Sequence, residues 1–242
     1  MPCVAAYRRR IGEKHMGKDS KDTFAVDTRN RSLKQWGEGL FALFVGLTIA
    51  HLGVSLFLVS ELGSDAFTVM IQGIARTLGL SIGTVHVITL ILLMIVMVLT
   101  TKGYVKPGTV VCAFCGGWII DLFLWMIGAK ISSGSPMWIR ILVMLAGCVI
   151  LSFGMSIVIE SNSGTGPNDL IAIILTDKLN QKWNVQFQYV RITCDICFAV
   201  IGFLLGGRLG IGTIAAAFLV GPAAQFFLPR SRKLIKTCFP DL

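Results

Sequence analysis

The sequence predicts an all-α transmembrane protein of six membrane-spanning helices, arranged as two inverted-topology repeats of three helices each. Hydrophobic residues make up 54% of the 242 residues and charged residues only 14%, whereas a soluble domain carries about 25% charged residues. Six apolar stretches are each long enough to cross a bilayer, and a pattern of small residues in the first half of the chain recurs in the second half. The mean hydropathy of +0.75 argues against a soluble enzyme, a disordered protein and a secreted disulfide scaffold.

The chain begins with a basic segment. Residues 1–35 hold nine of the 22 Lys and Arg residues and lack the apolar core of a signal peptide. A net charge of +9 suits nucleic acid in a soluble protein, but cytoplasmic segments of membrane proteins carry the same excess. We therefore expect residues 1–35 to form a disordered cytoplasmic tail and expect no nucleic-acid partner. Met16 remains an alternative start.

The six apolar stretches set the number of predicted spans. About 20 mostly apolar residues in a helix cover the hydrocarbon core of a bilayer. Tryptophan side chains such as Trp36 and Trp138 lie near the ends of these stretches, where amphipathic rings prefer to sit. The predicted spans are residues 39–60, 83–101, 107–128, 137–159, 186–206 and 211–229.

The basic residues predict the orientation. With the N-terminus in the cytoplasm, seventeen of the 22 Lys and Arg residues lie on the cytoplasmic side and only Arg76, Lys130, Arg140 and Arg208 on the other. We therefore expect a multi-pass protein of a bacterial plasma or inner membrane with both termini in the cytoplasm. Its expected parts are a membrane domain over 36–230 and a cytoplasmic C-terminal tail over 231–242.

The two halves of the chain repeat each other. Gly46, Gly53, Ser55 and Gly63 recur 101 residues later, and a second set recurs 104 residues later. The repeats cover residues 39–128 and 137–229. The second set is Gly108, Thr109, Ala113, Phe114, Gly117, Phe123 and Leu124.

The parity of the repeat predicts its topology. Each half contains three spans, so the second half must enter the membrane from the opposite face, which is the inverted arrangement found in many transporters. Each half also has a short apolar segment, at 65–79 and 167–180, that is too short to cross and is expected to form a re-entrant or interfacial helix. The glycines at seven-residue spacing are expected to let neighbouring helices approach closely.

Four motifs link the sequence to a known family, and the match extends over residues 34–229. The chain resembles the YczE/YitT-like family of bacterial integral membrane proteins, most closely its YczE branch. It departs from the family pattern at Ala66, where the family has proline, and at Asp195, where the family commonly has glutamate. The resemblance implies a membrane protein for which transport is the assumed role. The motifs are Leu62-Gly63-Ser64-Asp65-Ala66-Phe67-Thr68, Gly164-Thr165-Gly166-Pro167-Asn168-Asp169, Gly206-Gly207-Arg208-Leu209-Gly210-Ile211-Gly212-Thr213 and Gly221-Pro222.

Ionisable residues inside the spans are candidates for function, because a charge at the bilayer centre costs about 2.5–3.5 kcal/mol on insertion scales. Arg191 and Asp195 stand four residues apart on one helical face and are expected to pair. Two interpretations remain open. The pair is either a structural lock between helices, or Arg191 holds an anionic group while Asp195 is its counter-ion or a proton carrier.

Other polar residues complete the candidate substrate site. Asp65 and the Asn168-Asp169 pair start the two short helices, whose positive ends favour negative groups. His51 lies mid-span and is more often a hydrogen-bonded interior group than a ligand, while His86 is expected near the interface. Asp121 and Gln225 occupy corresponding positions of the two repeats and either line a pathway or bridge helices.

Two Cys-x-x-Cys pairs, Cys112 with Cys115 and Cys194 with Cys197, have the spacing of zinc ligands. A site with four thiolates in lipid would be expensive and the pairs are not equivalent in the repeats, so we expect no metal site. The sequence contains no set of residues typical of catalysis. We therefore expect neither an enzyme nor a bound cofactor.

These observations predict a secondary transporter or permease for a small polar solute, anionic or zwitterionic, that works by alternating exposure of a site between the halves. The aspartates repel a bare anion, so a zwitterion or a cation-coupled solute is equally allowed. The alternative is a non-transporting membrane scaffold or accessory protein in which the repeat serves only packing. Besides the lipid bilayer, a second copy of the chain is a possible partner.

Overall fold

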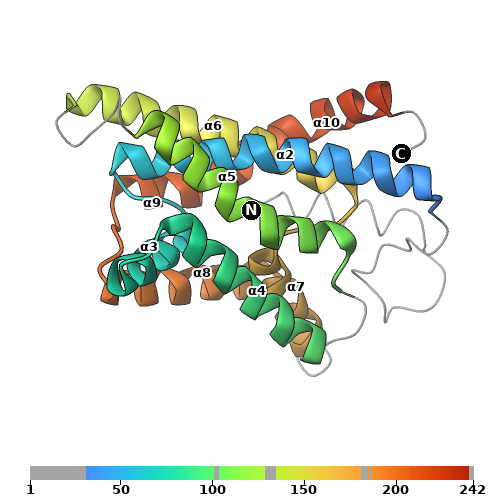
Figure 1. The fold of residues 1–242 in the computed structure, drawn as a ribbon, viewed down its shortest axis with the longest axis horizontal. Coiled ribbons are helices and arrows are strands. Elements are labelled where there is room, and N and C mark those ends of the chain that lie inside the picture. The colour runs from blue at the N-terminus through green and yellow to red at the C-terminus, as the bar shows by residue number, and fades with distance from the viewer. Residues whose placement is uncertain (1–30, 101–103, 129–134, 181–184, 186, 240–242) are drawn as a thin grey trace.

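The computed structural model describes residues 31–100, 104–128, 135–180, 185 and 187–239, and all its regular elements within these ranges are helices (Figure 1). Each half of the chain has the order long helix, short helix, long helix and a last apolar segment. The first half contains α2 (Leu33–Ser60), α3 (Ala66–Leu78), α4 (Ile82–Thr100) and α5 (Pro107–Ile127). The second contains α6 (Met137–Ser161), α7 (Pro167–Asn180), α8 (Phe187–Leu204), α9 (Ile211–Ala215), the π-helical η1 (Ala216–Val220) and α10 (Gly221–Cys238).

Four of these helices, α2, α4, α5 and α6, are long and apolar enough to cross a membrane. The short helices predicted at 65–79 and 167–180 are confirmed as α3 and α7. The predicted last span at 211–229 is not one straight helix, because 211–224 and 226–238 meet at 46°. The bend has a local cause: Pro229 cannot donate to the carbonyl group of residue 225, and its ring crowds that group. The predicted span at 186–206 corresponds to α8, which is not among the four.

The C-terminal end of the predicted membrane domain differs from the sequence expectation. Residues 1–30, most of the expected tail, lie outside the described ranges. At the other end α10 continues beyond residue 230 to Cys238, and Ser231 and Ile235 are buried. The Ser231 hydroxyl lies 2.6 Å from the hydroxyl of Ser156 on α6. The segment 231–238 is therefore part of the packed helical body, and 240–242 lie outside the described residues.

The helices α2 and α6 form the centre of the molecule and run antiparallel, side by side (Figure 1). Their backbones meet at glycines. A Cβ atom added to Gly53 would lie 2.8 Å from the carbonyl oxygen of Gly147, and one added to Gly154 would overlap the backbone of Ala50. The prediction that these glycines permit close helix approach is confirmed.

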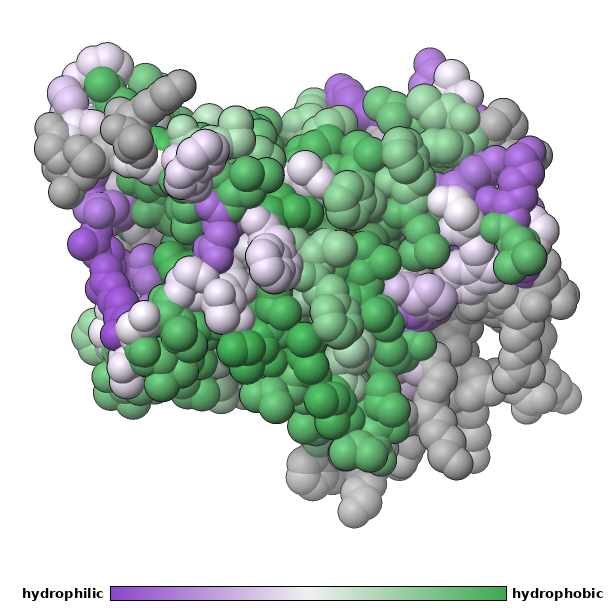
Figure 2. Space-filling model, in the orientation of Figure 1, coloured by the Kyte–Doolittle hydropathy of each residue, from purple (hydrophilic) through white to green (hydrophobic). Residues whose placement is uncertain are grey.

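The remaining helices pack around this pair. The helix α5 lies against α2, and α10 lies against α6. The short helix α3 packs on α8 of the other half, and α7 packs on both α8 and α4. Large apolar side chains such as Leu92, Val96 and Trp118 are exposed. Figure 2 shows a broad apolar band with hydrophilic residues gathered towards the two ends, as expected for a protein whose middle faces lipid.

Two backbone hydrogen bonds join the halves where the short helices begin. The Gly108 amide at the start of α5 donates to the carbonyl group of Ser163 over 3.0 Å, and the Gly212 amide at the start of α9 donates to that of Leu62 over 2.8 Å. Each accepting loop contains a glycine at positive φ, Gly63 at 109° in one half and Gly164 at 145° in the other. These bonds fix the loops that carry the polar starts of α3 and α7.

The central helix contact gives a first prediction. Gly154→Leu places a side chain against the α2 backbone and is expected to lower the free energy of unfolding by about 1–3 kcal/mol or more. Gly37→Leu is the matched control, because a Cβ atom at Gly37 on the same pair of helices meets nothing within 4 Å. Thermal unfolding of the detergent-purified variants measures the difference. Equal losses in both variants would contradict the close-packing role of Gly154.

Candidate functional site

The start of α3 is held by Asp65. Its carboxylate caps the helix, because Oδ2 accepts a hydrogen bond from the Thr68 amide over 3.1 Å and Oδ1 accepts one from the Ser64 hydroxyl over 3.3 Å. The same carboxylate lies close enough to interact electrostatically with His51 and Asp195. A residue that starts a short helix of the first half is thereby brought to a helix of the second half.

The start of α7 is joined to α8 by Arg191. Its Nη1 group donates to Asp169 Oδ1 over 2.5 Å, and its Nε group donates to Asp195 Oδ2 over 3.2 Å. The predicted pairing of Arg191 with Asp195 is confirmed, and Asp169 adds a second carboxylate that the helical spacing could not indicate. The Asn168 amide group donates to the same Asp169 oxygen over 3.3 Å. Asn168, Asp169, Arg191 and Asp195 therefore form one cluster, which we call the arginine cluster.

The net charge of this cluster limits the kinds of ligand that it can bind. One guanidinium faces two carboxylates, and Asp65 adds a third nearby, so negative charge is in excess. The side chains of Arg191 and Asp195 are 33% and 40% exposed on the protein, so neither is fully buried between the helices. The Nη2 group of Arg191 has no hydrogen bond to any described residue. The arrangement suits a ligand with a cationic group for the carboxylates and one acceptor for Nη2, and it disfavours a bare anion.

Two histidines lie beside Asp65 in the interior. His51 and His86 have ring centroids 5.5 Å apart, and Phe67 at the start of α3 packs edge-on against His86 at 5.7 Å. His51 Nδ1 lies 2.8 Å from the Leu47 carbonyl oxygen, so the buried His51 ring has a hydrogen-bond partner within its own helix. A Cβ atom on Gly116 would lie 2.7 Å from His51 Nε2 and 3.3 Å from His86 Nε2, so both rings pack against the helix α5 where it has no side chain.

His86 differs from its predicted place at the interface. His86 is only 7% exposed, and neither of its ring nitrogens has a hydrogen-bond partner among the described residues. The hydroxyl groups of Thr109 and Thr165 are also buried without a partner in the described part of the chain. Sequence reasoning placed His86 at the interface because its burial depends on how α4 packs against His51 and Phe67, and no spacing in the chain signals it.

Asp121 is separate from the arginine cluster. Its Oδ2 atom accepts from the Ser81 hydroxyl over 2.5 Å, and Oδ1 accepts from the Gly83 amide over 2.8 Å. These bonds satisfy the start of α4 and tie it to α5, which supports the helix-bridging interpretation of Asp121. The corresponding Gln225 lies on α10, and its side chain is outside what the structure describes.

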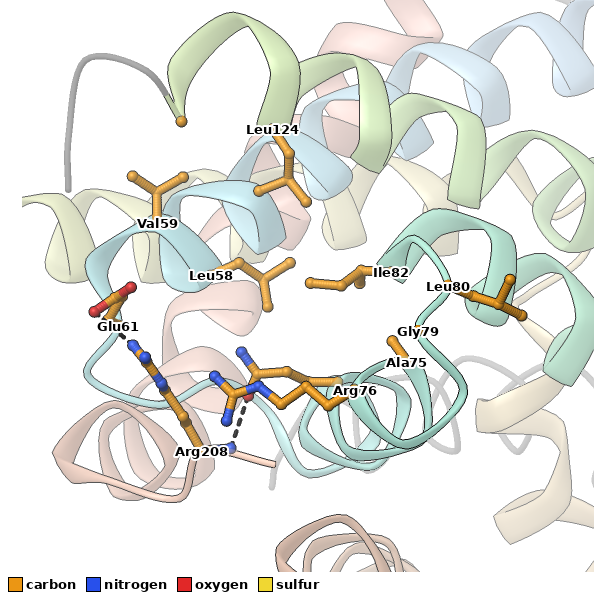
Figure 3. A pocket seen from close by; sticks show the side chains of 12 residues that line it. Leu58, Val59, Glu61, Ala75, Arg76, Gly79, Leu80, Ile82, Leu124 and Arg208 are labelled. Atoms are coloured by element: carbon orange, nitrogen blue, oxygen red, sulfur yellow. Dashed lines mark hydrogen bonds and ion pairs between the residues drawn. The ribbon is translucent and has the colours of Figure 1, made fainter. Parts of the chain in front are cut away.

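A cavity of about 540 Å³ opens at the end of the molecule where α2 ends and α4 begins. Figure 3 shows Arg208 reaching towards Glu61, and Arg76 extending from α3 into the same space. No candidate site residue predicted from the sequence lines this cavity. The sequence analysis used Arg76 and Arg208 only to predict orientation, and their 132-residue separation gave no sign that they meet.

The helical architecture and its apolar band define an integral membrane protein with several transmembrane helices. The chain belongs to the Family of unknown function (DUF6198), whose family model matches residues 38–229. The resemblance to YczE-like proteins stated from the sequence motifs is confirmed by the relatives.

Three relatives are similar over most of their length. The Uncharacterized membrane protein YczE of Bacillus subtilis (strain 168) is 30% identical over 194 residues, which cover 79% of this chain and 86% of the relative. An Uncharacterized protein of Haemophilus influenzae is 29% identical over 186 residues, or 77% and 81% of the two chains. The Uncharacterized protein YyaS of Bacillus subtilis is 29% identical over 186 residues, or 76% and 90%. No solved structure matches the chain.

The arginine cluster gives a second prediction. Arg191→Gln leaves Asp169 and Asp195 facing each other without a cation and is expected to destabilise the protein by about 1–3 kcal/mol, less than a fully buried pair because the groups are partly exposed. The double variant Arg191→Gln with Asp169→Asn removes one repelling charge and should recover part of the loss. Thermal unfolding in detergent measures both. A double variant less stable than the single one would contradict the electrostatic account.

His86 gives a third prediction. Two unpartnered buried ring nitrogens carry a desolvation cost of about 1–3 kcal/mol, and a phenyl ring of similar shape avoids it. His86→Phe is therefore expected to raise the thermal unfolding temperature. His51→Phe is the control, because it also loses the contact with Leu47 and should gain less. A fall in unfolding temperature for His86→Phe would mean that this ring makes a polar contact that the described residues do not supply.

Proposed function

We propose that the protein is a secondary transporter for a small zwitterionic solute, built from two inverted-topology repeats that together provide six spans. The matching order of helices in the two halves supports the repeat. So do the equivalent hydrogen bonds of Gly108 and Gly212, and the equivalent left-handed residues that end α2 and α6, Glu61 and Asn162, both with φ of 56°. With an odd number of spans in each half, the halves would face opposite sides of the membrane.

One observation carries the transport proposal. Arg191, on a helix with an apolar second half, is bonded to Asp169 at the start of one short helix, and Asp65 at the start of the other short helix interacts electrostatically with Asp195 of the same cluster. Charged groups inside membrane domains are expensive and commonly mark substrate pathways. Starts of short helices at the junction of inverted repeats are the usual place of a transporter's binding site.

The charges of the cluster define the solute class. A solute ammonium group would sit against Asp195 and Asp65, while a solute carboxylate would accept from Arg191 Nη2. This narrows the expectation of an anionic or zwitterionic solute to the zwitterion. The packing of α3 on α8 and of α7 on α4 is across the halves, so movement of one half would alter access to the cluster.

We place the chain in the bacterial plasma membrane with both termini in the cytoplasm, on the basis of its basic residues.

A specific observation favours the alternative of a non-transporting scaffold. Two of the three donor-bearing nitrogens of Arg191 are already bonded to carboxylates, so the residue joins α7 to α8 without any ligand. In that case the cluster would serve stability alone, and Asp195→Asn would change unfolding without changing any binding.

Ligand-induced stabilisation separates the two functions and gives a fourth prediction. The purified protein is screened by thermal unfolding against zwitterionic amino acids, matched carboxylic acids and matched amines. A zwitterion at about 100 times its Kd should stabilise the wild type by about 2.7 kcal/mol. Asp195→Asn should abolish this stabilisation, whereas the exposed Lys34→Gln should retain it.

Uptake into proteoliposomes then tests transport of the stabilising zwitterion. Uptake by the wild type and by Lys34→Gln, with loss in Asp195→Asn, is the expected result. Binding without uptake would contradict the transporter and favour the scaffold. Equal binding and uptake in Asp195→Asn and the wild type would contradict the proposed site.

A further inference from the structure

The cavity at the end of the molecule has the composition of a ligand site. Its volume of about 540 Å³ lies within the range of about 300–1,000 Å³ that small-molecule pockets occupy. Much of its wall is apolar, with a few polar groups from α2, α3 and the loop before α9. The apolar residues are Leu58, Val59, Ala75, Leu80, Ile82 and Leu124.

The charges in its wall are unbalanced. Arg76 and Arg208 line the cavity against a single carboxylate, Glu61. Glu61 is also shared, because its Oε2 atom accepts from Arg208 Nη1 over 2.5 Å and lies 3.8 Å from Arg140 Nη2. Both carboxylate oxygens of the nearby Asp121 already accept hydrogen bonds, one from Ser81 and one from Gly83. Positive charge is therefore in excess at this end.

Arg76 is the guanidinium available to a ligand. Within the described ranges it forms no ion pair, and its Nη1 group donates to the Gly206 carbonyl oxygen over 2.6 Å. Arg208 is fixed from two sides, since Glu61 holds its side chain and Gln72 Oε1 accepts from its backbone amide over 2.7 Å. Figure 3 shows Arg76 extending from α3 into the cavity and Arg208, from the loop after α8, reaching Glu61.

We propose that this cavity binds an organic anion with an apolar body. Its carboxylate or phosphate oxygens would accept hydrogen bonds from Arg76 and Arg208, while its apolar part would lie on Leu58, Leu80 and Ile82. Guanidinium groups suit such oxyanions because they offer paired donors in a plane. The proposal does not depend on transport, because the cavity shares no residue with the arginine cluster.

The same chemistry has two sources, a soluble carboxylate with a hydrocarbon chain and the headgroup of an anionic phospholipid. The experiment uses the full chain in phosphatidylcholine nanodiscs, titrated calorimetrically with octanoate, acetate and octylamine. In a second arm, mass spectrometry measures the phosphatidylglycerol retained by protein purified from mixed vesicles of phosphatidylcholine and phosphatidylglycerol.

Octanoate is expected to bind saturably and more tightly than acetate, and octylamine is expected not to bind. Arg76→Gln should weaken octanoate binding at least about tenfold, as expected for loss of a hydrogen bond between charged groups. Arg230→Gln, which removes the same charge from α10 outside this cavity, should leave binding unchanged. Leu80→Trp keeps both arginines and fills the apolar part, so it should also weaken binding.

The outcomes separate the sources and can overturn the proposal. Octanoate binding that depends on Arg76 assigns a soluble anion, and phosphatidylglycerol retention that depends on Arg76 assigns the lipid headgroup. Equal binding of octanoate and octylamine, or equal binding to Arg76→Gln and the wild type, would show mere partitioning and overturn the site. The absence of both octanoate binding and phosphatidylglycerol retention in the wild type would also overturn it. Equal unfolding temperatures of Arg76→Gln and the wild type show that a loss of binding in the variant is not a loss of folding.

Discussion

The close approach of the α2 and α6 backbones is the constraint on which the rest of the structure depends. Apolar side chains gain little by leaving lipid for another helix, so helices in a bilayer associate through packing. Glycines from both helices supply it here, with Gly53 facing Gly147 and Gly154 facing Ala50. The helices α5 and α10 then pack on this pair, one on each member. Their positions, and those of the loops they touch, follow from the central contact.

Those loops carry the polar chemistry. Where lipid offers no partner to a backbone amide, irregular segments must be satisfied within the protein. The starts of α5 and α9 do this by hydrogen bonding to the loops at Ser163 and Leu62, each from the opposite half of the chain. Asp65 and Asp169 are consequently placed at fixed helix starts, and one arginine from α8 completes the cluster. The hydrogen bonds that join the two halves therefore also position the candidate site.

Much of this architecture can be predicted from the sequence because it rests on local patterns. Apolar length predicts the long helices, the repeated glycines predict the central contact, and the four-residue spacing of Arg191 and Asp195 predicts their pair. The rest depends on tertiary packing. Asp169 lies 22 residues from Arg191, and the burial of His86 requires α4 to pack against His51. The bend near residue 225 depends on where Pro229 falls within α10, which apolar length alone does not reveal.

The arginine cluster is net negative and the end cavity is net positive. A solute with a single charge therefore cannot bind favourably at both. A bare organic anion is favoured by Arg76 and Arg208 but repelled by Asp65, Asp169 and Asp195 around a single guanidinium. A bare cation is favoured by these three carboxylates and repelled by Arg76 and Arg208. A solute with both charges is complementary to the arginine cluster through its ammonium group and its carboxylate together, and its carboxylate alone is complementary to the end cavity. If the end cavity selects anions without an ammonium group, its ligand is therefore not the solute of the cluster, and the two sites serve different molecules.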